Sequence, residues 1–173
     1  MIERTRVLFV CLGNICRSPT AEAVFREAAA RHGLLHRVEV DSAGTGDWHV
    51  GNPPDYRAIE HAARRGYDLR PLRARQITRH DFDRFHWVLA MDEAVLRDVS
   101  RMRPAGFGGR LGLFMDWVPE AGSRDVPDPY DEGPEAFERV LDLVMAGSNA
   151  LAARIAADLA APQPDPPGHS PGA

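Results

Sequence analysis

The 173-residue sequence contains no lysine, only two cysteines, and no long hydrophobic run near its N-terminus. Because all 21 basic residues are arginine, Schiff-base chemistry and phosphate loops that depend on lysine are excluded. Cys11 and Cys16 lie too close together to staple a secreted fold, which favours a reducing, intracellular setting. The apolar run at 7–12 is far shorter than a signal sequence or a membrane span. We therefore expect a cytoplasmic protein with no membrane partner.

The overall composition is that of a compact soluble domain. Hydrophobic residues make up 44% of the chain, charged residues 27%, and the formal net charge is -4. A chain of this length buries roughly 70% of its unfolded surface, so its core needs no disulfide or structural metal. The weakly acidic balance argues against a nucleic-acid partner. We expect one domain over residues 1–160, and a disordered proline-rich tail over 161–173, which holds five prolines and two glycines.

Short apolar runs alternate with helical patterns along the chain. Strands are predicted at 6–11, 38–43, 86–91 and 111–115, and helices at 18–33, 55–65, 93–101 and 134–159. Ser18 is the expected N-cap of the first helix, with Pro19 in its first turn. This alternation predicts an α/β fold: three α/β/α layers, a four-stranded parallel sheet, and a phosphate-binding loop after the first strand.

The segment that carries chemistry is 10–19 (VCLGNICRSP), which joins the first predicted strand to the first predicted helix. A loop at a helix N-terminus turns successive backbone N–H groups toward one point and adds the positive end of the helix dipole, and together these bind an anion such as phosphate. Arg17 can hold two phosphate oxygens with its planar guanidinium, while Cys11 lies beneath the phosphorus. The cysteine–arginine spacing alone is weak evidence, and its place between a strand and a helix supports it.

The same field favours the thiolate form of Cys11, to which Ser18 can donate its hydroxyl. Gly13 is predicted to adopt the positive φ that a nest of N–H groups needs, and Asn14 to brace the loop through side-chain hydrogen bonds. The alternative is structural. In that case Cys11 is a small buried residue at a strand end, and Arg17 is an ordinary surface residue beside it.

Attack of a thiolate on a phosphate ester also needs a proton donor for the departing oxygen. In the segment 125–132 (DVPDPYDE), two prolines enclose Asp128 and stiffen the chain around it, which is how an acid is fixed above a site made elsewhere in the sequence. The same composition also occurs in ordinary acidic turns. Asp128 is therefore a candidate general acid whose role the residue type alone leaves open.

Three segments together resemble the low-molecular-weight protein tyrosine phosphatase family: 7–23, 41–50 (DSAGTGDWHV) and 125–130, within a resemblance that covers roughly residues 5–160. The resemblance implies hydrolysis of phosphotyrosine in protein substrates, with no cofactor or metal and with inorganic phosphate as product and inhibitor. It implies that Cys11 is the nucleophile forming a phosphocysteine, that Arg17 binds the phosphoryl group, and that Asp128 is the general acid and then the base for water.

The resemblance also implies supporting roles. Ser18 stabilises the thiolate, and Asn14 and Ser42 form a hydrogen-bond network behind the loop. Trp48 and Tyr130 sandwich the phenyl ring, the alternative being that they merely cap the core. The residues implied to bind phosphate or line the substrate cleft are Leu12, Gly13, Asn14, Ile15, Cys16, Ser18, Trp48 and Tyr130.

Two positions depart from the family pattern. Leu72 stands where the family commonly has a histidine of the bracing network, so we expect a smaller network here. Asp131 stands where many members have a second tyrosine, which weakens the aromatic wall and prevents transfer of a peptide preference. A second loop cysteine in the family can form a reversible disulfide with the nucleophile, which the resemblance implies for Cys16 with Cys11. The alternative for Cys16 is a buried residue without a partner.

Four other functions fit the sequence less well. Arsenate reductases on the same scaffold pass a disulfide to a third cysteine, which this sequence lacks. Protein arginine phosphatases tend to have threonine where Ile15 stands, and the bulkier isoleucine favours a phenyl phosphate. A catalytically silent phosphopeptide-binding module needs only the anion site, not the nucleophile and the acid. Metal catalysis is disfavoured, because Gly33 interrupts the helix between His32 and His36 and the other histidines show no ligand spacing.

Overall fold

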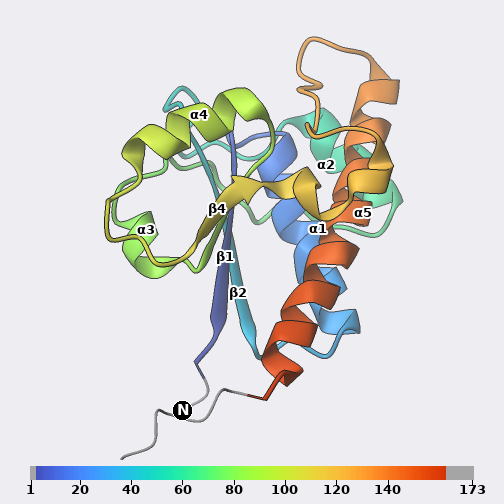
Figure 1. Cartoon of the computed structure of the whole chain (residues 1–173). Helices are drawn as coiled ribbons and strands as arrows, with labels where there is room; N and C mark the ends of the chain where they lie inside the picture. Colours follow the sequence, from blue (N-terminus) through green and yellow to red (C-terminus); the bar gives the residue numbers. More distant parts are fainter. Residues whose placement is uncertain (1–2, 163–173) are drawn as a thin grey trace, which may run out of the picture.

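Figure 1 shows the computed structural model, which describes residues 3–162. One parallel sheet is formed in the order β2-β1-β3-β4 by β1 (Thr5–Cys11), β2 (Val38–Gly44), β3 (Trp87–Ala90) and β4 (Arg110–Leu113). The helices are α1 (Arg17–Arg31), α2 (Tyr56–Arg64), α3 (Asp81–Arg84), α4 (Glu93–Met102) and α5 (Pro134–Ala160), with 3₁₀ turns η1 (Phe114–Trp117) and η2 (Pro119–Ala121). The predicted three-layer α/β/α fold with a four-stranded parallel sheet is confirmed.

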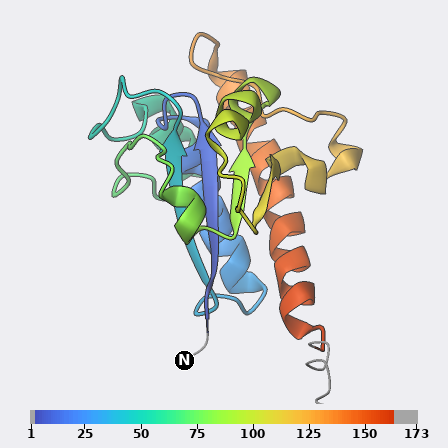
Figure 2. The same ribbon diagram turned by 60° about the vertical axis from the view of Figure 1, so that its left-hand side comes forward.

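The sheet separates two apolar layers, and the central strand β1 supplies both. Val7, Phe9 and Cys11 belong to the layer of α1, α2 and α5, whereas Leu8 and Val10 belong to the layer of α3 and α4 (Figure 1). This two-sided burial explains why β1 is apolar at consecutive positions rather than alternating with polar residues. In both views the start of β1 and the end of α5 lie at one end of the sheet, while the segment before α5 lies at the other (Figure 2).

Helix α5 is long and apolar enough, by length and composition, to cross a membrane. In the structure it packs against α1, α2 and η1 instead. Its apolar side joins the core through residues that include Phe137, Leu141, Val144, Leu151 and Ile155, each at most 3% exposed. This arrangement is that of a core helix.

The start of α1 differs from the prediction. The helix begins at Arg17, and its N-cap is Cys16, which makes no side-chain capping bond. The predicted N-cap role of Ser18 is therefore wrong, because this residue lies inside the first turn and its hydroxyl contacts Cys11. The observed N-cap lies two residues before the predicted one, so the arginine of the motif, Arg17, is the first residue of the helix.

Two further differences concern short elements. The strand predicted at 111–115 ends at Leu113, because Phe114 and Met115 begin the 3₁₀ turn η1, and a buried apolar run does not distinguish a strand from a buried turn. The four-residue helix α3 was not predicted, since it is too short to show a helical period. The tail predicted at 161–173 lies, from residue 163 onward, outside the described residues.

Candidate active site

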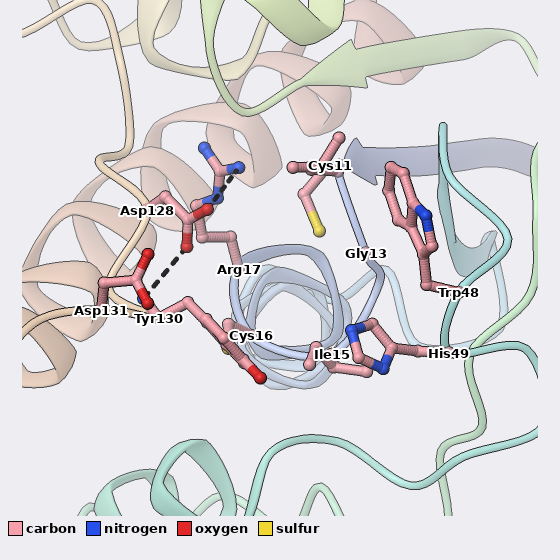
Figure 3. A pocket seen from close by; sticks show the side chains of 11 residues that line it. Cys11, Gly13, Ile15, Cys16, Arg17, Trp48, His49, Asp128, Tyr130 and Asp131 are labelled. Atoms are coloured by element: carbon pink, nitrogen blue, oxygen red, sulfur yellow. Dashed lines mark hydrogen bonds and ion pairs between the residues drawn. The ribbon is translucent and has the colours of Figure 1, made fainter.

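A pocket of about 240 Å³ opens where β1 passes into α1 (Figure 3). Two segments form much of it: the phosphate loop, residues 11–17, and the acid loop, residues 125–130. The lining residues are Cys11, Leu12, Gly13, Ile15, Cys16, Arg17, Trp48, His49, Asp128, Tyr130 and Asp131. Three predicted site residues do not line the pocket: Asn14, which is a buried part of the phosphate loop, and Ser18 and Ser42, which lie behind that loop. Each is at most 5% exposed.

Cys11 ends β1 and is held by two polar neighbours. Its Sγ lies 2.9 Å from Ser18 Oγ and accepts a hydrogen bond of 3.3 Å from the backbone N–H of Asn14. The sulfur also faces the first turn of α1, where unpaired backbone N–H groups and the helix dipole attract negative charge. This environment suits a thiolate, and the same N–H groups suit a phosphate dianion.

Asn14 fixes the shape of the phosphate loop. Its φ is 55°, and among the described residues it is the one non-glycine residue with a positive φ. The prediction that Gly13 takes this conformation is therefore wrong. Gly13 instead allows His49 to pack closely, because a Cβ there would lie 3.1 Å from His49 Cδ2. Asparagine adopts a positive φ more readily than other non-glycine residues, because its short side-chain amide can form hydrogen bonds with nearby groups of the loop.

The hydrogen bonds of Asn14 have a definite direction. Its Oδ1 accepts from the backbone N–H of Arg75 at 3.0 Å, so its Nδ2 donates to Ser18 Oγ at 2.8 Å and to Ser42 Oγ at 3.0 Å. Each serine oxygen thus receives one proton and has its own left to give. For Ser18 two acceptors are within reach, Cys11 Sγ at 2.9 Å and the carbonyl of Ala43 at 3.4 Å. The shorter contact favours donation of the hydroxyl proton to the sulfur.

The other branch of the network ends on a buried carboxyl that the sequence did not single out. Ser42 Oγ donates to Glu22 Oε1 at 2.8 Å, and Glu22 is 5% exposed. Burial raises the pKa of the Glu22 carboxyl above its ordinary value, against the hydrogen bond from Ser42 and the charge of Arg26. Leu72, which stands where a histidine was expected, packs against the hydrophobic core. The network runs instead from Asn14 through Ser42 to Glu22.

Arg17 lies under the acid loop with its side chain only 3% exposed. Its Nη1 donates to Asp92 Oδ2 at 2.5 Å and to the carbonyl of Val126 at 3.0 Å, and its Nη2 lies 3.9 Å from Asp128 Oδ2. Burial acts to lower the pKa of the guanidinium, but the charges of Cys11, Asp92 and Asp128 raise it overall, so the group stays a cation. The arginine is therefore oriented before any anion binds.

Asp92 is a site residue that sequence reasoning missed. It follows β3, and its Oδ1 caps α4 by accepting from the backbone N–H of Val95 at 2.8 Å, while its Oδ2 holds Arg17. One carboxyl group thus connects the start of α4 to the phosphate loop. The available signal was its position, because an acid directly after a buried parallel strand lies at the carboxyl edge of the sheet, where ligands bind.

Asp128 stands above the pocket with its side chain 46% exposed. Its Oδ1 accepts from the backbone N–H of Tyr130 at 3.1 Å, and its Oδ2 is the oxygen near Arg17 (Figure 3). The acid loop is tied to the sheet where the backbone N–H of Val126 donates to the carbonyl of Met91 at 2.7 Å. Asp128 is thus held by its neighbours yet is open to a ligand.

The mouth of the pocket has aromatic walls. Trp48 and Tyr130 stand on opposite sides of it, 67% and 47% exposed (Figure 3). The Trp48 ring packs on Gly46, where a Cβ would lie 1.8 Å from the ring. His49 and Asp131 also line the mouth, and the sequence had marked Asp131 as a departure but had given His49 no role.

The two cysteines have different surroundings. Both are free and buried, at 2% and 5% exposure for Cys11 and Cys16. Burial, together with the charge of Asp55, raises the pKa of the Cys16 thiol far above its ordinary value, so this cysteine stays protonated. No group of three or more His, Cys, Asp or Glu side chains within residues 3–162 is placed to hold a metal ion.

Known proteins resemble this chain over nearly its whole length. The family model described as "Low molecular weight phosphotyrosine protein phosphatase" matches residues 6–161. The low molecular weight protein-tyrosine-phosphatase YfkJ of Bacillus subtilis is 44% identical over 151 residues, which cover 86% of this chain and 94% of that relative.

Solved structures agree. A protein tyrosine phosphatase of Entamoeba histolytica with Hepes in its active site superposes with a TM-score of 0.85 at 32% identity, covering 90% of this chain and 99% of the other. A Drosophila arginine phosphatase superposes with a TM-score of 0.80 at 27% identity, covering 86% and 96%. The chain belongs to the low molecular weight phosphotyrosine protein phosphatase family.

Proposed function

We propose that this chain hydrolyses phosphotyrosine in proteins through a phosphocysteine intermediate. In the first step Cys11 Sγ attacks phosphorus, an S–P bond forms, the bond from phosphorus to the phenolic oxygen breaks, and Asp128 gives that oxygen a proton. In the second step Asp128 takes a proton from water, the water oxygen attacks phosphorus, and the S–P bond breaks to release inorganic phosphate and the thiolate. The scheme needs no metal or cofactor.

The observation that carries this proposal is the joint position of nucleophile, anion-binding groups and acid. Ser18 and Asn14 donate to the Cys11 sulfur, and both interactions stabilise the thiolate as nucleophile and as leaving group. Arg17 is already oriented by Asp92, so no reorganisation is needed when charge builds on the phosphoryl oxygens. Asp128 and the Cys11 sulfur lie on opposite sides of the Arg17 side chain (Figure 3), which supports a role for Asp128 at the leaving oxygen.

The substrate class follows from the walls of the pocket. Ile15 lines it as an apolar side chain only 8% exposed, and Trp48 and Tyr130 offer ring faces to a planar group. A phenyl phosphate suits these surfaces better than the charged guanidinium of phosphoarginine. Because the nucleophile has to be a free thiol, the proposal also places the protein in a reducing compartment, the cytoplasm.

The decisive experiment measures hydrolysis of para-nitrophenyl phosphate across pH, in the presence of a chelator, by the parent, Cys11→Ser and Cys16→Ser. We expect turnover by the parent, retention in Cys16→Ser, and loss in Cys11→Ser. Phosphotyrosine and phosphoarginine peptides are then compared side by side. Preference for phosphoarginine would make the chain an arginine phosphatase. Capture of phosphotyrosine peptide with no turnover by the parent would make it a binding module.

A further inference from the structure

Arg57 does not line the pocket, yet it contacts segments on both sides of it. It lies in the first turn of α2 and forms a two-point ion pair with Asp55, with Nε 3.1 Å from Oδ1 and Nη2 2.9 Å from Oδ2. The backbone N–H of Asp55 donates to the carbonyl of Ile15 at 2.8 Å. The ion pair is therefore anchored directly on the phosphate loop.

The same guanidinium reaches the acid loop. Arg57 Nη2 donates to the carbonyl of Tyr130 at 3.0 Å, and its Cζ lies 5.6 Å from the centre of the Tyr130 ring and 4.7 Å from that of Phe137. Phe137 is a buried residue of α5, so the cation contacts both a fixed ring and the ring of the wall. Tyr130 also donates its own N–H to Asp128 Oδ1. Both polar backbone groups of Tyr130 are thus engaged, one by Arg57 and one by the candidate acid.

The ion pair stays charged at neutral pH. Burial acts to raise the pKa of Asp55, but the hydrogen bonds from Arg57 outweigh it and lower that pKa below its ordinary value. The Asp55 side chain is 9% exposed and that of Arg57 is 29% exposed, so the contact is partly shielded from solvent. A two-point pair of this kind fixes the plane of the guanidinium, which a lysine cannot reproduce.

We propose that Arg57 is a positioning residue that holds the acid loop against the phosphate loop, fixing the Tyr130 ring as a wall and, through the Tyr130 backbone, the Asp128 carboxyl. Arg57 itself takes no part in making or breaking bonds. Its effect on catalysis rests on the proposed function, whereas its effect on ligand binding does not. Ligands that carry a ring, and substrates that need an acid, depend on this contact, while the affinity for bare phosphate does not.

Arg65 offers a matched control. It caps the C-terminal end of the same helix, also bridges α2 to α5 through Glu138 and Asp142, and has a side-chain exposure of 27%. Calorimetry measures the binding of phenylphosphonate and of inorganic phosphate to the parent, Arg57→Gln and Arg65→Gln. We expect Arg57→Gln to weaken phenylphosphonate binding by about tenfold and phosphate binding by less than about twofold. Arg65→Gln leaves both within about twofold.

Kinetics test the link to the acid. Phenyl phosphate has a poorer leaving group than para-nitrophenyl phosphate and depends more on a proton donor. The decrease in kcat/KM caused by Arg57→Gln is expected to be larger for phenyl phosphate than for para-nitrophenyl phosphate. In Arg57→Lys, the decrease for phenyl phosphate is expected to be smaller than in Arg57→Gln, but kcat/KM should stay below that of the parent. Equal weakening of phenylphosphonate and phosphate, or behaviour equal to Arg65→Gln, would overturn the proposal. A parent without turnover defeats the proposed function, and the phenylphosphonate titration still decides the role of Arg57.

Discussion

The phosphate loop and the acid loop face each other across one pocket, yet they are built in opposite ways. The phosphate loop is mostly buried, although Leu12 is 42% exposed. Asn14 and Arg17 are each 2% exposed, and both are held in place by hydrogen bonds. The acid loop is stiffened by prolines, and its working residues are exposed, Asp128 at 46% and Tyr130 at 47%. We infer that anion binding is set by a rigid, buried unit, whereas substrate choice and proton transfer are set by side chains that are exposed to solvent.

The largest effect is expected from a conservative change in the buried loop. Arg17→Lys keeps the charge but cannot donate to Asp92, to the Val126 carbonyl and to a phosphoryl group in one plane. We expect kcat/KM for phosphotyrosine peptide to fall by about 10³-fold, the scale for removing a transition-state oxyanion donor. Arg31→Lys, on the exposed end of the same helix, serves as control. A fall of less than tenfold would mean that Arg17 is not the phosphoryl-binding group.

The next effect tests the acid loop. Asp128→Asn removes the proton donor while keeping its shape, and we expect kcat/KM for phenyl phosphate to fall by about 10²-fold. The loss should be smaller for para-nitrophenyl phosphate, because its better leaving group depends less on a proton donor. Steady-state kinetics on the two substrates check the prediction, and an equal loss on both would remove Asp128 from the role.

A change at the mouth of the pocket should lower the affinity for the aromatic part of the substrate and leave phosphate binding unchanged. Trp48→Ala removes one aromatic wall from a residue that is 67% exposed. We expect KM for phosphotyrosine peptide to rise by about tenfold, with kcat and the inhibition constant of inorganic phosphate nearly unchanged. Steady-state kinetics with phosphate as competitor measure all three quantities. A parallel weakening of phosphate inhibition would show that anion binding in the buried phosphate loop depends on the exposed mouth, and would break the division between buried and exposed parts of the pocket.

This contrast also explains what the sequence predicts well. The phosphate loop is readable because strand, loop, helix start and arginine follow one another, so neighbours in sequence are neighbours in space. Asp128 is readable because two prolines mark a fixed loop. Asp92, Glu22 and Arg57 are not readable in this way, because each acts on a group that only the sheet topology brings near. The positive φ of Asn14 was assigned to Gly13, since residue preference ranks glycine first while the hydrogen bonds of the asparagine decide the outcome.

The smallest effect concerns the buried end of the network. Because burial raises the folded-state pKa of Glu22, with Arg26 and Asp41 as its charged neighbours, the folded protein holds this proton more tightly than the unfolded chain does. Its contribution to stability is therefore full below about pH 4.5, the ordinary value, and is lost as pH rises through the raised pKa.

The variant Glu22→Gln tests this. Its side-chain carbonyl still accepts the hydrogen bond from Ser42, and the buried negative charge is removed. The ion pair with Arg26 is lost, but the Arg26 side chain is half exposed, so this pair contributes little to the free energy of unfolding. We expect the Tm of the variant to exceed that of the parent by about 2–4 °C at neutral pH, on the order of 1 kcal/mol for a chain of this size, and to equal it below pH 4.5. Glu27→Gln, exposed on the same helix, should show neither change. A lower Tm for Glu22→Gln at neutral pH would mean that the carboxylate stabilises the network behind the phosphate loop, so that this rigid loop itself depends on a titrating group.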